Sequence, residues 1–295
     1  MTYLQRYLAE EIGVDHADGL ISRREALRRL ALIGLGAGAA SSLLAACGGD
    51  DSVSPPAGTG ATSPTLPGET AAEAITFPGP EGRALQGAWA AAAEPRGGVL
   101  VIHENRGLND HIRSVAGRFA AEGYSSLAID LLSEEGGTAA LGGEAEAMAA
   151  LSAAPLERLV ADMQAGVGEL GRRLPESKLA AVGFCFGGGM VWALLDAGEP
   201  RLAAAVPFYG PAPDEPDLSG SRAAVLAIYA GMDSRVNASR ETASAALEEV
   251  GLVHEIATFP GVDHAFFNDT GARYDSLAAT RAWTRVLAWF ERYLG

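Results

Sequence analysis

The segment VGFCFGGGM, residues 182–190, decides the fold expected for this 295-residue chain. The residues that lead into it, KLAAVGF, form a short apolar run typical of a buried β-strand, and those that follow, GGGMVWALLDAG, predict a helix of small side chains. Cys185 stands at the junction, with Gly183 two residues before it and Gly187 two residues after it. The pattern fits a nucleophile on a strand-to-helix turn, and it also fits a small core residue beside a glycine-rich packing site.

Strands and helices alternate on both sides of this segment. Buried strands are predicted at residues 97–104, 125–132, 178–184, 201–210, 223–231 and 253–261, and helices at 109–124, 155–174, 238–251 and 277–294. Residues 84–93 predict an early strand, antiparallel and near an edge. This alternation predicts right-handed crossovers and a mostly parallel, doubly wound α/β sheet with helices on both faces.

The composition excludes several classes of function. The formal net charge is -15 and Lys178 is the only lysine, so a surface that follows a nucleic-acid backbone is not expected. The carboxylates are scattered and the chain has 5 histidines, which argues against a dedicated metal site. We expect no metal and no organic cofactor.

Residues 1–46 are predicted to be an export signal. The paired Arg23 and Arg24 precede an apolar, Gly/Ala-rich run at 30–46, which is shorter than the ~20 residues of a membrane-spanning helix. The run ends in LAAC, which resembles a bacterial lipobox, and SRREALR resembles a twin-arginine export motif. These resemblances imply lipidation of Cys47 and an exported protein anchored to the bacterial cell envelope. Both Tat and Sec export stay open.

The alternative is that this segment is a short buried Ala/Leu helix of the globular domain. Against it, residues 47–73 are rich in Gly, Pro, Ser and Thr and read as a linker that cannot bury a core. The expected organisation is therefore signal 1–46, linker 47–73 and catalytic domain 74–295.

Three polar residues follow three of the predicted strands, in the order Cys185, Asp233 and His264. In a parallel sheet, chemistry gathers at the carboxyl ends of the strands. A thiol needs a base to become a thiolate, imidazole suits that task near neutral pH, and a carboxylate fixes the imidazole. Taken singly, these residues could be an inert core thiol, a helix cap and a loop histidine. Together they predict a catalytic triad.

The motifs GFCFGG, GMDSRV, GVDHAFFNDT and VIHENRGLN resemble the dienelactone hydrolase family. The resemblance runs from about residue 75 to the C-terminus and implies an α/β-hydrolase fold. It implies that Glu104 contacts the resting Cys185 and helps to activate it, and that the backbone N–H groups of Asn105 and Phe186 form the oxyanion hole. Without the resemblance, Glu104 would be read as a solvated residue or as a partner of Arg106.

The chain departs from the family where the substrate binds. Dienelactone-type members hold the substrate carboxylate with arginines, whereas this chain has Asn268 near one such place, Arg273 further on, and Glu134 and Glu135 in the loop after the strand at 125–132. We therefore expect hydrolysis of a small-molecule ester or lactone, carboxymethylenebutenolidase-like in chemistry, through a thioester. The alternatives are a thioesterase or other acyl hydrolase of the same fold, and a non-catalytic, membrane-anchored binding protein.

Overall fold

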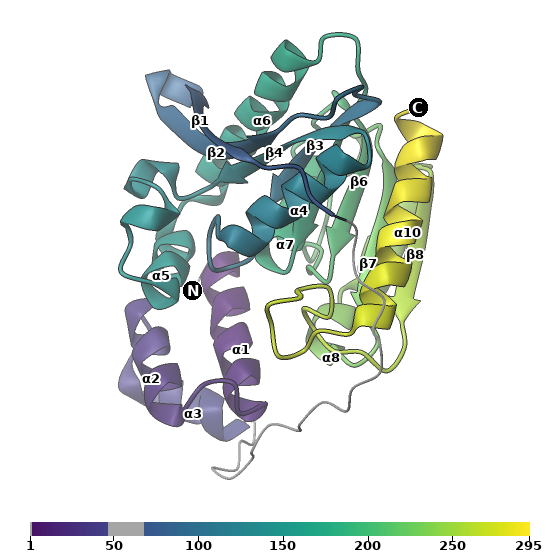
Figure 1. The fold of residues 1–295 in the computed structure, drawn as a ribbon. Coiled ribbons are helices and arrows are strands. Elements are labelled where there is room, and N and C mark those ends of the chain that lie inside the picture. Colours follow the sequence, from purple (N-terminus) through teal and green to yellow (C-terminus); the bar gives the residue numbers. More distant parts are fainter. Residues whose placement is uncertain (1, 47–67) are drawn as a thin grey trace.

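The computed structural model describes residues 2–46 and 68–295. Its centre is an eight-stranded sheet in the order β1-β2-β4-β3-β5-β6-β7-β8 (Figure 1). The strands are β1 Glu73–Pro78, β2 Ala84–Ala90, β3 Gly97–Ile102, β4 Tyr124–Asp130, β5 Leu179–Phe184, β6 Leu202–Phe208, β7 Ala224–Ala230 and β8 His254–Phe259. Cys47 and residues 48–67 of the predicted linker lie outside the described residues.

The sheet is parallel from β4 to β8, and β2 runs antiparallel to both β1 and β4. β3, β5 and β7 are buried along their whole length, as expected of strands covered on both faces. The antiparallel strand predicted near the edge is β2. The predicted α/β-hydrolase fold is confirmed.

Helices cover both faces of the sheet. α4 and α10 lie on one face, where Phe119 packs on Trp283 with ring centroids 4.5 Å apart, and α6 and α7 lie on the other (Figure 1). The helices of the domain are α4 Asp110–Ala121, α5 Glu144–Ala153, α6 Leu156–Arg173, α7 Phe186–Asp196, α8 Ser234–Asn237, α9 Arg240–Glu249 and α10 Ser276–Tyr293, with short 3-10 turns η1 Pro80–Gly82, η2 Ser133–Glu135 and η3 Thr138–Ala140.

The N-terminal segment folds onto this domain. It forms α1 Tyr3–Ala17, α2 Arg23–Leu32 and α3 Ala37–Ala46, and both α1 and α2 pack against α5 (Figure 1). Leu4, Leu8 and Ile12 recur every four residues on α1, so they form one buried apolar stripe. The predicted signal segment therefore contacts the domain, and the division into signal, linker and domain stays a prediction.

The apolar run predicted at 30–46 is divided, since α2 ends at Leu32 and α3 begins at Ala37. Among the described residues, no helix combines the length and the apolar character needed to cross a membrane. Arg23 and Arg24 are exposed. The export signal itself stays a prediction.

Candidate active site

Cys185 sits on a strained turn between β5 and α7. Its backbone has φ +56° and ψ -117°, in the left-handed half of conformational space that non-glycine residues rarely occupy. Such a conformation costs about 1–3 kcal/mol and persists only where the surroundings enforce it. The N–H of Cys185 donates to the carbonyl of Phe208 at 3.0 Å, which ties the turn to β6. The sequence prediction of a strand-to-helix elbow is confirmed.

The glycines around Cys185 are required by close backbone contacts. A Cβ on Gly183 would lie 2.1 Å from the carbonyl oxygen of Gly187, and one on Gly187 would lie 2.3 Å from that of Ile102. Both carbonyls are backbone groups that cannot rotate away, so a larger residue at either position would distort the turn. The spacing read from the sequence therefore has a steric origin.

The structure brings the other two predicted triad residues to the elbow. Asp233 follows β7 and His264 lies in the loop after β8, and the Nδ1 of His264 lies 2.5 Å from the Oδ2 of Asp233. The other carboxylate oxygen of Asp233 accepts the N–H of Val236 at 3.1 Å and caps α8. Asp233 thus caps α8 and also contacts His264. All three side chains are buried, as their positions at the strand ends predict.

The charges at the site are strongly coupled. Burial would raise the pKa of Asp233, but the neighbouring His264 outweighs it and lowers that pKa. Burial raises the pKa of the Cys185 thiol. Burial alone would lower the pKa of His264, yet Glu11, Cys185 and Asp233 together raise it well above the ordinary value. In this arrangement the pKa values of His264 and of the Cys185 thiol are therefore both raised.

Glu104 is buried next to this group. Its Oε2 accepts a hydrogen bond from the Nδ2 of Asn268 at 2.7 Å, and its Oε1 has no hydrogen-bond partner among the described residues. The Oδ1 of Asn268 accepts from both the N–H and the hydroxyl of Thr270, which fixes the amide so that its NH₂ faces Glu104. Glu104 is thus held by Asn268, rather than by Arg106.

The two predicted oxyanion-hole residues lie where the resemblance puts them. Asn105 and Glu104 line one small cavity with Cys185 and His264, and Phe186 is the first residue of α7. Neither the Asn105 nor the Phe186 N–H donates a hydrogen bond to any described residue.

The remaining candidate residues have structural roles. His103 is buried, and its Nε2 accepts the N–H of Leu131 at 3.2 Å, so its Nδ1 carries the proton and donates to the carbonyl of Glu104 at 2.6 Å. His111 begins a predicted helix, where we expect a surface or rim residue, but it is buried and its Nδ1 lies 2.9 Å from the Oδ1 of Asp269. It belongs to a helix face packed into the protein, so the surface prediction was wrong.

The loop after β4, which carries Glu134 and Glu135, is not part of the cavity at Cys185. Arg158 binds Glu134 at 2.8 Å and Glu135 at 2.9 Å, and none of these residues lines the cavity at Cys185. Tyr209 and Phe208 are buried in an aromatic cluster, and the Tyr209 ring stands edge-on to His264 with centroids 5.1 Å apart. Tyr209 therefore contributes to the packing of the imidazole.

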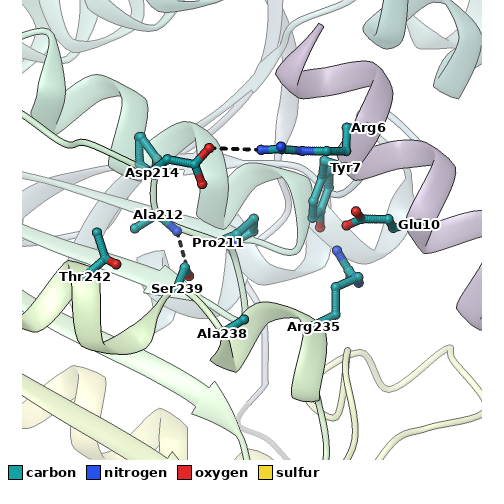
Figure 2. Close-up of a pocket in the computed structure, with 11 residues that line it drawn as sticks. Arg6, Tyr7, Glu10, Pro211, Ala212, Asp214, Arg235, Ala238, Ser239 and Thr242 are labelled. Atoms are coloured by element: carbon teal, nitrogen blue, oxygen red, sulfur yellow. Dashed lines mark hydrogen bonds and ion pairs between the residues drawn. The ribbon is translucent and has the colours of Figure 1, made fainter. Parts of the chain in front are cut away.

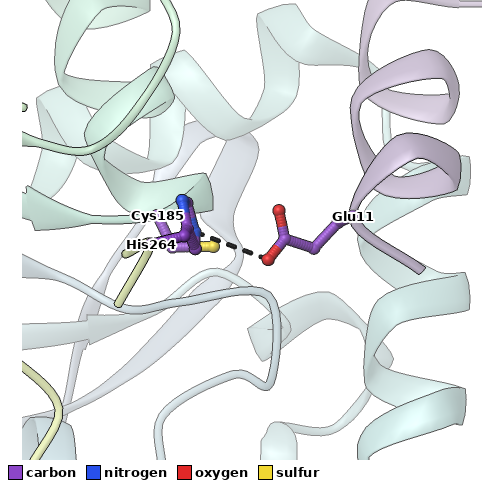
Figure 3. Close-up of side chains that lie close together, drawn as sticks. All are labelled: Glu11, Cys185 and His264. Atoms are coloured by element: carbon purple, nitrogen blue, oxygen red, sulfur yellow. Dashed lines mark ion pairs between the residues drawn. The ribbon is translucent and has the colours of Figure 1, made fainter. Parts of the chain in front are cut away.

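Two residues of α1 reach the site, and the sequence analysis missed both. The hydroxyl of Tyr7 lies 3.2 Å from the Sγ of Cys185, and a carboxylate oxygen of Glu11 lies 3.4 Å from the Nε2 of His264 (Figure 3). The Sγ of Cys185, the imidazole of His264 and the carboxylate of Glu11 each have a possible metal-ligand atom, and these atoms lie within 4.8 Å of one another. Glu11 belongs to α1, so this cluster exists only while α1 is docked. No local motif distinguishes Tyr7 or Glu11.

Arg235 and Arg273 complete the surroundings. Arg235 pairs with Glu11 and stacks on Tyr7, with the guanidinium carbon 4.8 Å from the ring centroid. Arg273 pairs with Asp15 at 3.0 Å and Asp18 at 2.5 Å. Arg235 lies two residues after Asp233, in the short helix α8 that Asp233 caps. That closeness to a predicted site residue was the sequence feature that could have placed Arg235 at the site.

Comparison with known proteins agrees with this geometry. A model of the dienelactone hydrolase family matches residues 85–294. A protein of Escherichia coli O157:H7 assigned as a carboxymethylenebutenolidase is 31% identical over 210 residues, which cover 67% of this chain and 77% of the relative. A protein of Saccharolobus solfataricus with the same assignment is 28% identical over 247 residues, covering 72% and 95%.

Solved structures show the same relationship. A crystal structure assigned as a dienelactone hydrolase from Klebsiella pneumoniae is 29% identical, with a TM-score of 0.67, and covers 75% of this chain and 98% of that one. A dienelactone hydrolase-like promiscuous phosphotriesterase from metagenomic libraries is 25% identical, with a TM-score of 0.63 and coverage of 77% and 100%. The chain therefore belongs to the dienelactone hydrolase family and is a hydrolase of carboxylic esters.

Proposed function

We propose that this enzyme hydrolyses a small-molecule ester or lactone through a thioester on Cys185, with His264 as the base and Asp233 as its partner. The observation that carries the proposal is the strained elbow. It holds Cys185 within reach of an imidazole whose other nitrogen is bound to Asp233 at 2.5 Å. Backbone strain of this kind clusters at functional sites, where the surrounding structure maintains it.

The proposed reaction is a sequence of proton transfers through His264. His264 takes the Cys185 proton at Nε2 as the Sγ attacks the carbonyl carbon, and it gives that proton to the leaving alkoxide when the C–O bond breaks. A water then loses a proton to Nε2 and attacks the thioester. The acid leaves, and the proton returns to the sulfur. For a lactone, the alkoxide and the acid belong to one molecule.

The oxyanion would bind to the N–H groups of Asn105 and Phe186. Support comes from their lack of other partners and from the position of Phe186 at the N-terminus of α7, where the helix dipole favours negative charge. Glu104 would act on the resting thiol through its unpaired Oε1.

We also propose that the protein is exported and anchored to the cell envelope by lipid on Cys47. The support is the LAAC sequence at 44–47 and the exposure of Arg23 and Arg24, which leaves the paired arginines accessible. Intact-mass analysis of envelope protein tests this. We expect the wild type to begin at Cys47 and carry a diacylglyceryl group, and a Cys47→Ala chain to lack it. A wild type that retains residues 2–46 without lipid would contradict the proposal.

The hydrolase proposal is tested with a panel of short aryl esters and lactones. Because Tyr7 and Glu11 contact the triad, the chain is assayed both as the wild type and as Tyr7→Phe/Glu11→Gln, each with and without Cys185→Ala. We expect Cys185→Ala to lower the rate by roughly a thousandfold or more. Equal rates with and without Cys185 would contradict the nucleophile assignment. No turnover by any of the four chains would favour the binding protein.

A further inference from the structure

α1 covers the catalytic group directly. Its Tyr7 hydroxyl contacts the Sγ of Cys185 at 3.2 Å, and its Glu11 carboxylate stands 3.4 Å from the Nε2 of His264, the nitrogen that the mechanism needs as its base (Figure 3). Each of the two atoms that would do the chemistry therefore faces a side chain of α1. Tyr7 and Glu11 are one helical turn apart, so a single helix face makes both contacts.

The space left at the triad is too small for a substrate. The cavity that Cys185, His264 and Glu104 line measures about 50 Å³. A water occupies ~30 Å³ of liquid, and ligand pockets usually start at ~300 Å³. An aryl ester cannot reach Cys185 in this arrangement.

A larger cavity lies beside the first one. It measures about 310 Å³ and is lined by Arg6, Tyr7 and Glu10 of α1 and by Arg235 and Ser239 of the domain (Figure 2). α1 thus supplies wall residues to both cavities. Movement of α1 away from the domain takes a wall from each of them and gives the triad a space of the size that a ligand needs.

Charged contacts hold α1 in this position. Arg235 binds Glu11, Arg273 binds Asp15 and Asp18, and Arg6 binds the exposed Asp214 at 3.2 Å. The Glu11 and Arg235 side chains are only 5% and 15% exposed, so this pair is screened little by solvent. Removal of one partner leaves the other charge buried and unpaired, which weakens the docked state strongly.

The docked helix also sets the wrong proton positions for catalysis. Burial alone would lower the pKa of His264. Of the neighbours that raise it, Glu11 has the largest effect, and with Cys185 and Asp233 it brings the pKa well above the ordinary value. Burial raises the pKa of the Cys185 thiol most, and the Glu11 carboxylate raises it further. A protonated His264 cannot accept the thiol proton.

We propose that α1 is an intramolecular inhibitor, which blocks Cys185 with Tyr7 and ties His264 to Glu11 until the N-terminal segment is released. The inference rests on the proposed function in one respect, namely that Cys185 and His264 are the reacting groups. Cleavage before Cys47, which the anchoring proposal requires, would remove α1 from the chain. Processing at the envelope would then switch the hydrolase on.

The test uses the unprocessed chain, shown by intact mass to retain residues 2–46. Two variants, Glu11→Gln and Asp15→Asn/Asp18→Asn, are compared with the wild type, and the second removes ion pairs of α1 without changing a contact with the triad. The control is Glu10→Gln, which makes the same change one position earlier, at a carboxylate that has no ion pair among the described residues. The first readout is the iodoacetamide alkylation rate of the Cys185 peptide at pH 7. The second is hydrogen exchange of the α1 amides before and after alkylation.

We expect Glu11→Gln and Asp15→Asn/Asp18→Asn each to raise the alkylation rate about tenfold or more, because a buried charge is left unpaired in the docked state, and Glu10→Gln to leave it within about twofold. In the wild type, alkylation should accelerate exchange in α1 and leave β5 protected. Rates for the two α1 variants equal to that of Glu10→Gln, or unchanged α1 exchange after alkylation, would overturn the inference. Neither readout needs ester turnover, so failure of the proposed function would appear separately, as chains with a reactive Cys185 that hydrolyse nothing in the panel.

Discussion

At Cys185, one residue combines a costly backbone with a reactive side chain. The positive φ is enforced by neighbours that approach too closely for any side chain at Gly183 or Gly187. The thiol lies at the carboxyl end of β5 near His264, and the N–H of Phe186 donates no hydrogen bond among the residues that the structure describes. The glycines at 183 and 187 thus allow the strained turn that holds the Cys185 thiol at the site.

The steric part of this account predicts the effect of Gly187→Ala. The new Cβ would lie 2.3 Å from the carbonyl oxygen of Ile102 and 2.6 Å from that of His103, and neither can move without distorting β3. We expect the free energy of unfolding to fall by about 2–3 kcal/mol. Gly142→Ala is the matched control, because its Cβ meets only the Glu146 side chain at 3.7 Å. Equal urea midpoints for the two variants would contradict the steric account.

The two roles of Asp233 can be separated by substitution. Asp233→Asn keeps an oxygen that accepts the Val236 N–H but loses the charge beside His264, whereas Asp233→Ala loses both. We expect both variants to lower kcat by about two to four orders of magnitude. Only Asp233→Ala should show the additional loss of about 1 kcal/mol of stability that follows removal of a helix cap. Steady-state kinetics and urea unfolding measure the two effects, and a full rate in Asp233→Asn would exclude Asp233 from the triad.

At the scale of elements, the site is assembled from loops at the carboxyl ends of the parallel strands. β5, β7 and β8 deliver Cys185, Asp233 and His264, and the loop after β3 delivers Glu104 and Asn105. α1, by contrast, reaches the site from the N-terminal segment and does not follow a strand of the sheet. Its docking depends on charge, and so on pH.

Docking of α1 should weaken at both ends of the pH scale. Glu11 raises the pKa of His264, so the stabilisation that this pair gives to the docked state is lost as the pH rises through the raised value. Burial would raise the pKa of Glu11, but His264 and Arg235 lower it, so its stabilisation is present above 4.5 and is lost as the pH falls through the lowered value. The charged and titratable groups that face this pair are Tyr7, Asp15, Glu104, Cys185, Asp233, Arg235 and Arg273.

The measurement is the Cys185 alkylation rate of the wild type divided by that of Glu11→Gln, from pH 6 to pH 10. Glu11 also raises the pKa of the Cys185 thiol, so the division removes only the part of the thiol ionisation that both chains share. We expect a ratio well below one near neutral pH that climbs toward one as His264 loses its proton. A ratio that does not change over this range would show that the pair with His264 does not hold α1.

At the scale of the whole molecule, the alternation of apolar runs was enough to predict the parallel core of the sheet and the antiparallel β2, whereas the edge strand β1 was not predicted. Cys185, Asp233 and His264 could be predicted because each follows a strand whose end the fold brings to one edge. Tyr7 could not, since it meets Cys185 from 178 positions away through the docking of a helix. The burial of His111 was missed for a similar reason, because its partner Asp269 lies on a distant loop.

The N-terminal segment shows why composition can predict a role without predicting a placement. Its paired arginines, apolar run and LAAC ending indicate an export signal, and those features are local. Its packing on the domain depends instead on the stripe of Leu4, Leu8 and Ile12 and on arginines supplied by remote loops. The same residues can therefore serve as an address and, before export, as a cover for the site.

The central claim is that Cys185 carries the acyl group. The most direct measurement mixes p-nitrophenyl acetate with the wild type and with Glu11→Gln, quenches in acid, and maps the acetyl group by peptide mass. The account predicts a hydroxylamine-labile acetyl thioester on the Cys185 peptide, in greater amount in Glu11→Gln. Release of p-nitrophenol with no acetyl on Cys185, or with the acetyl group on another residue, would contradict it.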